Sequence, residues 1–292
     1  MYYYIDDKKG VFMEFNLTDT AKNHIVVVAH RGVSGGNIPC NTTASYDIAL
    51  KQGADMIEVD VSKSIDGKLF LFHPFMEHAH LNKFLLTSLL PYSLIKKLHY
   101  VNYDNTPTQF NLCSFDDFLE EYNDKCFINI DKFWANPKKI YNDIKRHNML
   151  DQIIVKSKPD KKVFDILENL APDIQYMPIV KNTHSCHYLL KSKNINYIGV
   201  EVLFDNENAN VASYEFIEKM HKDNVLVWVN SIIYNYRNQL SAGHSDDTAL
   251  TKSEDLGWGW LVDRGFDIIQ TDWPLMLINY LKNSGKYKKQ HF

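Results

Sequence analysis

No apolar run in the sequence approaches the ~20 residues that a membrane-spanning helix requires, so stable membrane insertion is not expected. The first residues, MYYYIDDKKG, also lack the basic region and the apolar core of a signal peptide. The expected location is therefore the cytoplasm. A secreted or periplasmic protein whose export signal has been removed would show the same features.

Cysteine is scarce, and the net charge is small. The four cysteines show no CxxC spacing, which predicts free thiols in a reducing compartment and argues against a zinc site. The formal net charge is −4, and the charged residues are dispersed instead of forming the basic stripe of a nucleic-acid-binding protein. Nucleic acid is thus excluded as the main partner. An anionic small molecule is not, because a local cluster or a metal can bind one.

The sequence does contain a regular alternation of β-rich apolar runs and amphipathic segments. Eight runs are expected to form strands, at residues 25–30, 56–61, 126–131, 153–157, 175–180, 197–204, 225–230 and 266–272. They are nearly continuously apolar, which is typical of parallel strands covered on both faces. Seven helical patterns accompany them, at residues 43–52, 115–122, 137–147, 161–170, 184–191, 212–222 and 275–282.

This alternation predicts an α/β fold, a single (β/α)8 TIM-barrel domain over residues 1–292. A doubly wound sheet is the alternative, but it more often has a Gly-rich phosphate loop after its first strand. Two connections are longer than a barrel needs: residues 74–113, in a small inserted segment after the second strand, and residues 231–260. Loops of this length are usually functional, and both are expected at the catalytic end of the barrel.

The strand MIEVDV contains two acids, Glu58 and Asp60, that face the same way, because strand residues two apart share a face. Adjacent buried carboxylates repel each other and are costly without a partner. Asp131, at the end of a neighbouring strand, is expected to converge on them. The three acids fit either a salt-bridge cluster or one divalent metal, Mg²⁺ or Ca²⁺, since both ions prefer oxygen ligands.

Two histidines also stand at strand ends. His30 ends the first strand and His73 ends a short strand after the second, and a histidine pair beside a metal predicts general acid–base chemistry. Singly, either histidine would more often be structural. Arg31, directly after His30, suits a phosphate oxygen. Since no Ser or Cys nucleophile motif is present, the set indicates cleavage of a phosphodiester that supplies its own nucleophile.

Several further residues have both a structural and a functional interpretation. Trp228 is expected either to wall a glycerol or sugar site or to pack inside the barrel, and Asn230 could bind substrate. Glu201 could orient a substrate hydroxyl or form a salt bridge with Lys181. The second long connection holds three polar residues that either touch substrate or are ordinary loop residues: His244, Asp246 and Asp247.

The stretch HRGVSGGNIPCNTTASYDIALKQGADMIEVDVSKSIDGKLFLFHP resembles the opening of the glycerophosphodiester phosphodiesterases. That family shows His-Arg-Gly, Pro-Glu-Asn-Thr, Gly-Ala-Asp, Glu-x-Asp-Val, Asp-Gly and His-Asp in this order. VLVWVN resembles the family's seventh strand, and GFDIIQTDWP resembles its last. The resemblance is dense over residues 30–74 and intermittent elsewhere, and it implies a (β/α)8 barrel hydrolase that uses a divalent metal.

Carried over position by position, the resemblance implies a metal site, an acid–base pair and a phosphate ligand. These are, in that order, Glu58, Asp60 and Asp131; His30 and His73; and Arg31. The implied reaction begins with attack of a glycerol 2-hydroxyl on phosphorus while one histidine takes its proton. The other histidine protonates the leaving alcohol, and water then opens the cyclic phosphate to give glycerol 3-phosphate.

The sequence departs from the family pattern at three positions. Cys40 replaces the Glu of Pro-Glu-Asn-Thr, and Pro74 replaces the Asp after the closing His. Cys40 is expected to be a packing residue and not a nucleophile. The third strand ends in Asp131-Lys132 instead of Glu-x-Lys, and strand alternation predicts that Lys132 points away from Asp131. We therefore expect Lys156, at the end of the next strand, to supply a cation to the phosphate, unless it is an ordinary solvated strand end.

Two other functions stay open at this point. A related barrel enzyme could act on a lysophospholipid, on a sugar phosphodiester or on another bond beside a hydroxyl. A non-catalytic barrel that only binds a metal or a ligand would be expected to lack one of four residues. All four are present: His30, Glu58, Asp60 and His73.

Overall fold

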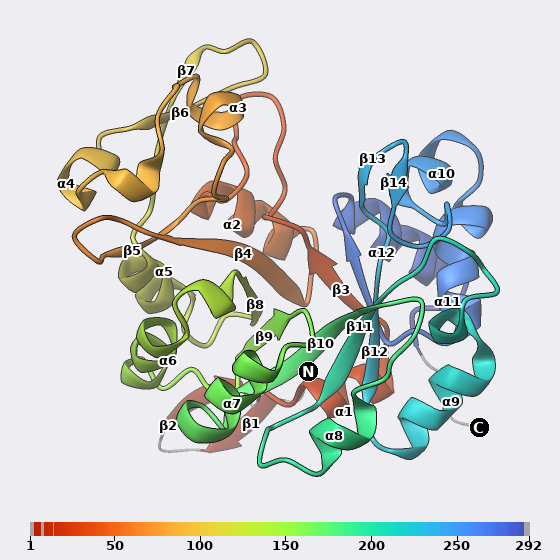
Figure 1. Ribbon diagram of the computed structural model, residues 1–292. Helices are drawn as coiled ribbons and strands as arrows, with labels where there is room; N and C mark the ends of the chain where they lie inside the picture. The colour runs from red at the N-terminus through yellow and green to blue at the C-terminus, as the bar shows by residue number, and fades with distance from the viewer. Residues whose placement is uncertain (1–2, 7–8, 14, 289–292) are drawn as a thin grey trace.

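Eight parallel strands close into a barrel in the computed structural model of the chain, which describes residues 3–6, 9–13 and 15–288 (Figure 1). In order around the barrel they are β3 (Val26–Ala29), β4 (Met56–Lys63), β8 (Phe127–Asp131), β9 (Ile153–Ser157), β10 (Gln175–Lys181), β11 (Gly199–Leu203), β12 (Leu226–Asn230) and β15 (Ile268–Thr271). β15 pairs with β3, and β3 pairs with β4, which closes the ring. The predicted TIM barrel and its eight strands are confirmed.

All seven predicted helices are present. They are α2 (Thr43–Lys51), α5 (Phe115–Tyr122), α6 (Pro137–Arg146), α7 (Lys161–Leu170), α8 (His187–Lys191), α9 (Tyr214–Lys222) and α12 (Pro274–Asn283). Side-chain caps fix several starts: Thr42 and Ser45 form a capping box at α2, and the Ser114 hydroxyl accepts the Asp117 N–H at 3.0 Å at α5.

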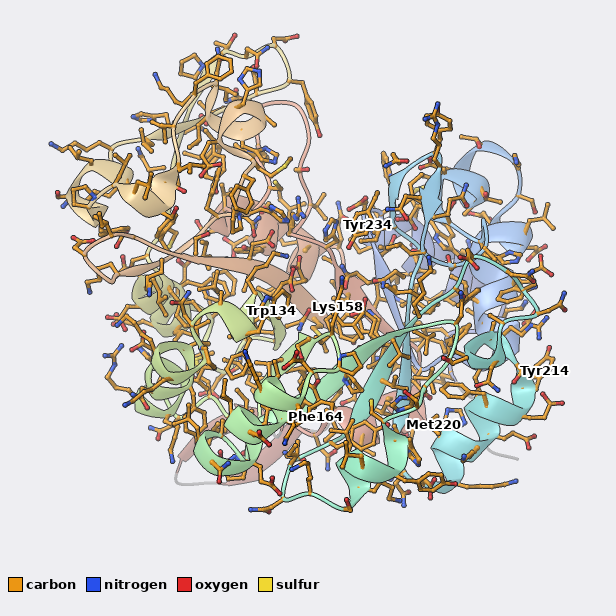
Figure 2. All side chains as sticks on the ribbon, viewed as in Figure 1. Trp134, Lys158, Phe164, Tyr214, Met220 and Tyr234 are labelled. Carbon is orange, nitrogen blue, oxygen red and sulfur yellow. The ribbon has the colours of Figure 1, made fainter. Side chains whose placement is uncertain are left out.

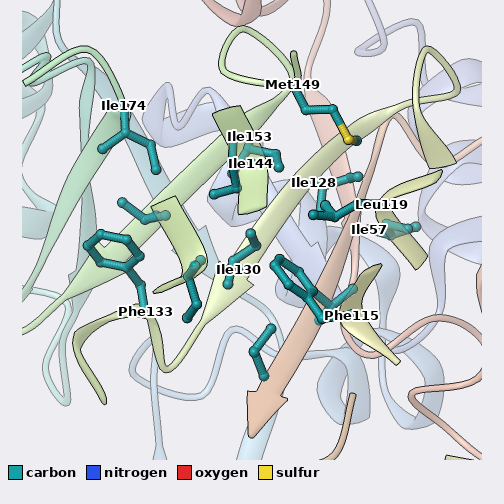
Figure 3. Packing of buried hydrophobic residues seen from close by; sticks show 14 of the residues in the cluster. Ile57, Phe115, Leu119, Ile128, Ile130, Phe133, Ile144, Met149, Ile153 and Ile174 are labelled. Carbon is teal, nitrogen blue, oxygen red and sulfur yellow. The ribbon is translucent and has the colours of Figure 1, made fainter. Parts of the chain in front are cut away.

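The outward faces of the strands form the main core with these helices. Ile57 of β4 and the isoleucines 128 and 130 of β8 pack against Phe115 and Leu119 of α5, as Figure 3 shows. All five side chains are fully buried. Each contributes about 1.5–3 kcal/mol through removal of apolar surface from water, so the barrel wall is held rigidly where its carboxyl ends emerge.

Along each strand, inward-facing positions alternate with the outward-facing ones. Near the amino ends of the strands the interior is apolar and includes Val28, Met56, Ile154 and Trp228. Helix α1 (Leu17–Asn23), which the sequence analysis did not predict, closes this end with the buried Leu17 and Ala21. It follows the hairpin of β1 (Tyr3–Asp6) and β2 (Lys9–Met13), also not predicted. The same inward-facing register is polar near the carboxyl ends, which places the polar residues at the barrel mouth.

Strand β4 continues past the barrel and pairs antiparallel with β5 (Leu69–Leu71). The chain then forms α3 (Glu77–Leu81), α4 (Tyr92–Ile95) and the hairpin of β6 (His99–Val101) and β7 (Pro107–Asn111). We call residues 64–113 the inserted lobe; it stands apart from the barrel in Figure 1. It has a small core of its own, made of Phe70, Phe72, Leu81, Ile95, Tyr100 and Leu112. The sequence predicted an insertion here but only one of its strands.

The second long connection also contains secondary structure. It holds β13 (Ile233–Asn235), β14 (Asn238–Gln239), α10 (Asp246–Thr251) and a π-helical turn, Asp255–Gly259, that leads into α11 (Trp260–Arg264). Figure 1 shows this segment and the inserted lobe rising from the same end of the barrel. Among the described residues, no helix combines the length and the apolar character that crossing a bilayer requires.

Candidate active site

Glu58, Asp60 and Asp131 meet at the barrel mouth. Each offers a carboxylate oxygen, and the three oxygens lie within 4.8 Å of one another. The parallel register of β4 and β8 causes this convergence, because it sets Asp60 directly beside Asp131. Glu58 and Asp60 are buried, and Asp60 Oδ1 accepts no hydrogen bond within the described part of the chain. A buried carboxylate oxygen without a donor is costly, and this one is available to a ligand.

The two acids of β4 have different protonation behaviour. Burial raises the pKa of Glu58 to about 7, and the charge of Asp60 adds to the effect. Burial also disfavours ionisation of Asp60, but Arg31, His73 and Lys132 outweigh it and lower the pKa of this carboxyl. Asp60 therefore ionises more readily than Glu58.

Arg31 contacts both acids through a local turn. Its backbone is left-handed, with φ 57°, and Gly32 follows with φ 76°. This turn aims the Arg31 N–H at Glu58 Oε2, 3.0 Å away, and brings Nε to 2.9 Å from Asp60 Oδ2. The amide of Asn41 also donates to Asp60 Oδ2, at 2.9 Å. The guanidinium is thus fixed beside the carboxylates.

His73 reaches the cluster through the antiparallel pairing of β4 and β5. The N–H of Phe72 bonds to the carbonyl of Asp60 at 2.9 Å, and His73 Nε2 then lies 4.0 Å from Asp60 Oδ1. The His73 Nδ1–H donates to the carbonyl of Pro74 at 2.8 Å, so Nε2 faces the site with its lone pair. Burial lowers the pKa of His73, as do the charges of Arg31 and Lys132.

His30 is held by a residue that follows β15, the strand that pairs with β3 on the side away from β4. Its Nδ1–H donates to Asp272 Oδ1 at 2.8 Å. Burial lowers the pKa of His30, but the hydrogen bond that His30 donates to Asp272 and the charge of Glu58 more than compensate, and the pKa is raised. The two histidines of the mouth therefore have opposite preferences: the Asp272 carboxylate favours protonated His30, whereas His73 favours the neutral form.

Asp272 is in turn fixed by Asp246, a residue of the second long connection. The backbone N–H of Asp272 donates to Asp246 Oδ2 at 2.8 Å. The other oxygen of Asp246 accepts from three side chains at 2.6–2.8 Å: Ser231, Trp258 and Thr271. Burial raises the pKa of Asp246 despite these donors. From the sequence, we expected Asp246 either to touch substrate or to be an ordinary loop residue, and the structure places it behind the site.

The chain resembles known proteins both in a short stretch of sequence and in its fold. A 50-residue match, 52% identical, relates the chain to the probable glycerophosphodiester phosphodiesterase 1 of Mycobacterium tuberculosis and covers 17% of this chain and 18% of that protein. The chain thus matches less than a fifth of that relative's length. A glycerophosphoryl diester phosphodiesterase structure from Parabacteroides distasonis superposes with a TM-score of 0.76 and 14% identity, over 96% of this chain and 99% of that chain.

Both the short sequence match and the shared fold are with glycerophosphodiester phosphodiesterases. An Oleispira antarctica phosphodiesterase, solved in complex with the product sn-glycerol-3-phosphate, shares the fold with a TM-score of 0.64 and 18% identity. Its structure covers 89% of this chain and is itself covered over 97%. A family described as a domain of unknown function matches residues 176–281, the carboxyl-terminal half of the barrel with the second long connection.

Lys132 lies at the acidic cluster. We expected Lys132 to point away from Asp131, and this prediction was wrong. Strand β8 ends at Asp131, and Lys132 has a left-handed backbone with φ 65°, so strand alternation no longer applies. Its ammonium group contacts Asp131 and lies 3.7 Å from Asp60 Oδ1. A lysine ammonium group is therefore present at the acidic cluster.

Lys156 has a different environment. It is buried, with Nζ 2.6 Å from Glu201 Oε2 and 3.7 Å from the centroid of the Trp228 ring. The alternative that Glu201 pairs with Lys181 was wrong, because Lys181 Nζ lies instead 3.2 Å from an oxygen of Asp205. The role of Lys156 in phosphate binding stays a prediction, and its charge is already balanced by Glu201.

Trp228 and Asn230 contact the ion pair of Lys156 and Glu201. Trp228 is fully buried in the barrel interior, and its Nε1–H donates to no acceptor in the described residues. Asn230 donates from Nδ2 to Glu201 Oε1 at 2.6 Å. Both side chains lie in the barrel wall beside Lys156, and their contact with substrate remains a prediction.

The family's glutamate position is occupied by an inert thiol. Burial raises the pKa of Cys40 to about 12, so the thiolate nucleophile is not formed near neutral pH. Its sulfur lies 4.0 Å from Nε2 of the half-buried His80. All four cysteines, each in the described part of the chain, are free thiols as predicted.

Two aromatic residues at the mouth were not identified from the sequence. Trp134 follows β8 and lies over the ammonium group of Lys132, 5.6 Å from its ring centroid. Tyr234 extends from β13 and is 68% exposed. Figure 2 shows both at the end of the barrel that carries the site. A lone aromatic residue in a loop gives no sequence signal that separates it from ordinary surface residues.

The buried acidic cluster fits a divalent metal site. Glu58, Asp60 and Asp131 are an oxygen-only donor set, which suits a hard cation such as Mg²⁺ or Ca²⁺. Buried Asp60 Oδ1, which accepts no hydrogen bond from the described residues, is the clearest sign that the cluster is built for a ligand. The histidines on two sides and the cations Arg31 and Lys132 give the mouth the charges that a phosphodiester requires.

Proposed function

We propose that the protein is a metal-dependent hydrolase that cleaves glycerophosphodiesters to glycerol 3-phosphate and an alcohol. The observation that carries this proposal is the convergence of the three carboxylates between His30 and His73, with Arg31 fixed 2.9 Å from Asp60. The local sequence match to a probable glycerophosphodiester phosphodiesterase and the shared fold with the product-bound Oleispira antarctica phosphodiesterase support the choice of substrate.

Glu58, Asp60 and Asp131 would hold one divalent cation, Mg²⁺ or Ca²⁺. When bound, it would supply Lewis-acid stabilisation of the phosphoryl oxygens. Arg31 would bind a phosphate oxygen directly, and Lys132 would add a second positive charge. Since Arg31 is held by both Glu58 and Asp60, it needs little reorganisation to bind the phosphate.

The hydrogen bonds of the two histidines support different roles for them in this proposal. His73 donates Nδ1–H to Pro74, which leaves the Nε2 lone pair free to take the proton of the attacking glycerol 2-hydroxyl. The new bond joins that oxygen to phosphorus, and the bond from phosphorus to the leaving alcohol breaks. His30, whose imidazolium is stabilised by Asp272, protonates the leaving oxygen. In the second step water opens the cyclic phosphate, and the two histidines exchange roles.

The test is hydrolysis of glycerophosphocholine with EDTA, and again after Mg²⁺ or Ca²⁺ is restored. Turnover that returns with the metal and is absent in His30→Ala and His73→Ala variants would support the proposal. An intact protein that binds metal but leaves the diester uncleaved would exclude this substrate. A panel containing lysophospholipids and sugar phosphodiesters, assayed in parallel, separates the leading function from its nearest alternative.

A further inference from the structure

The inserted lobe exposes an unusual concentration of apolar side chains. Of the seventeen large apolar residues that are exposed in the described part of the chain, seven lie between residues 65 and 103. They are Ile65, Phe75, Phe84, Leu86, Leu89, Leu94 and Tyr103. Exposed apolar residues are normal when scattered, but their concentration in one segment marks an interaction surface.

The exposed charged side chains of the inserted lobe are mostly positive. Four are lysines, Lys68, Lys83, Lys96 and Lys97, and two are acids, Asp66 and Asp104. The third acid of the lobe, Glu77, is buried and accepts the N–H and the hydroxyl of Thr87, both at 2.9 Å. The exposed side chains of the lobe thus carry a positive net charge on a chain whose formal net charge is −4.

Backbone hydrogen bonds hold several of these apolar side chains on the outside of the lobe. The N–H of Leu89 bonds to the carbonyl of Leu86 at 3.0 Å and closes a tight turn in which Thr87 is buried while both leucines are exposed. The N–H of Ile65 bonds to the carbonyl of Leu90 at 3.1 Å, which ties the β4–β5 turn to this one. Ile95 fills the lobe core, so its neighbour Leu94 faces out. We call Ile65, Leu86, Leu89 and Leu94 the lobe patch.

We propose that the inserted lobe docks on an anionic lipid bilayer surface. Apolar side chains that project from a cationic surface insert at the boundary between headgroups and acyl chains, and lysines are attracted to anionic headgroups. The described helices cannot span a bilayer, so the binding is peripheral. Because Phe75 lies only two residues after His73, docking would bring the barrel mouth close to the membrane.

The charge of the lobe disfavours a second copy of this chain as the occupant. A two-fold interface would bring the lysines of two lobes together, and interface cores are depleted of lysine. A lipid surface of opposite charge meets no such penalty. This inference goes beyond the proposed hydrolase function, because bilayer binding does not depend on turnover.

The experiment is co-sedimentation of the full chain with vesicles of phosphatidylcholine alone and of phosphatidylcholine mixed with phosphatidylglycerol. We expect binding to the anionic vesicles and a clear reduction at high salt. Two double variants, Leu86→Ser with Leu89→Ser and Lys96→Glu with Lys97→Glu, should each lower the partition coefficient about tenfold. The matched controls are Leu256→Ser and Lys252→Glu, exposed residues outside the lobe that should leave binding unchanged.

Two results would overturn the proposal. One is the absence of binding to anionic vesicles, or binding that the lobe variants leave intact. The other is a dimer in analytical ultracentrifugation that the lobe variants convert to a monomer, since the patch would then contact a second copy. Hydrolysis of soluble glycerophosphocholine should persist in all lobe variants. A chain that hydrolyses but does not sediment contradicts only the docking, and one that sediments without hydrolysis contradicts only the proposed function.

Discussion

The carboxylate of Asp246 accepts the backbone N–H of Asp272 at 2.8 Å, while the side chain of Asp272 holds His30 at the same distance. A buried acid from the second long connection thus positions the partner of a candidate catalytic histidine. None of the hydrogen bonds described for Asp246 involves Glu58, Asp60 or Asp131. Its effect on activity would therefore pass through Asp272.

Asp246→Asn should lower kcat about tenfold, which corresponds to about 1.4 kcal/mol of lost transition-state stabilisation. The side-chain amide of the asparagine would place its own N–H groups against groups that donate hydrogen bonds to Asp246 in the wild type. Asp272 would then shift and stabilise the His30 imidazolium less well. The alkaline limb of the kcat–pH profile should then move to lower pH. Ser231→Ala is the matched control, because it removes a donor to Asp246 without changing the acceptor of Asp272. Equal kcat values for the two variants would contradict a positioning role for Asp246.

Lys156→Met should destabilise the fold by about 3–5 kcal/mol, because it leaves Glu201 buried without its cation. Urea unfolding measures this change. The double variant Lys156→Met with Glu201→Gln should recover much of the loss. If Lys156→Met is as stable as the wild type, the buried pair is not what holds this part of the barrel.

Lys132→Met should instead reduce kcat/KM about tenfold with little change in the free energy of unfolding. Its ammonium group is partly exposed and lies beside Asp131 and Asp60, where the phosphate would bind. Steady-state kinetics on the substrate identified by the diester panel measures the effect. A larger kinetic loss in folded Lys156→Met than in Lys132→Met would return the phosphate role to Lys156.

Gly32→Ala should be the most damaging of three glycine substitutions in the first loop. A Cβ on Gly32 would lie 2.5 Å from Ser45 Oγ and 2.6 Å from the Ser45 carbonyl carbon, and the backbone φ is +76°. We expect a loss of more than about 2 kcal/mol from strain and overlap together. Gly36→Ala, with φ +57° and open space around it, should cost about 1–2 kcal/mol, and Gly35→Ala nearly nothing. Equal thermal unfolding of all three would contradict this account.

Acidification should destabilise the protein partly through His184. Burial lowers its pKa to about 4, helped by the charges of His187 and Lys219, and its Nε2 pairs with the Tyr197 hydroxyl at 2.8 Å. An unfolded histidine has a pKa of about 6.5, so the unfolded chain binds more protons between these values. The stabilisation is complete above pH 6.5 and is lost as the pH falls toward 4.

The measurement for His184 is the difference in unfolding free energy between about pH 7 and about pH 5, compared with the same difference in His184→Gln. The wild type should lose more stability than the variant. His78→Gln, at an exposed position, is the control and should behave as the wild type. A pH dependence that is identical in wild type and His184→Gln would refute the assignment.

The barrel could be predicted from the sequence because its strands are determined locally. Residues such as those of VLVWVN are apolar throughout, and a strand buried on both faces needs that composition regardless of what surrounds it. The pairing of Glu58 with Asp60 followed from the two-residue period of a strand, and the convergence with Asp131 followed from the parallel register. Local periodicity and one topological rule were sufficient for this part of the site.

Lys132 and Asp246 could not be placed by the same reasoning. Strand alternation was applied to Lys132 one residue beyond the point where β8 ends, and the left-handed backbone there reverses the direction of the side chain. Asp246 acts through contacts with Trp258 and Thr271, which are 12 and 25 residues away and follow no periodicity. Long connections are ordered by such specific contacts, which a pattern of residue types does not encode.

Strand β4 is shared by the barrel and the inserted lobe. Its first half, which carries Glu58 and Asp60, is part of the barrel wall, and its end pairs with β5 to form the base of the lobe. The lobe is therefore not a flap on a flexible hinge. A displacement of the inserted lobe would be transmitted along one hydrogen-bonded strand to the backbone of Asp60. Grafting a different lobe onto this barrel would have to preserve the β4–β5 ladder, since the residues that register the lobe also set the spacing between His73 and its carboxylate partner.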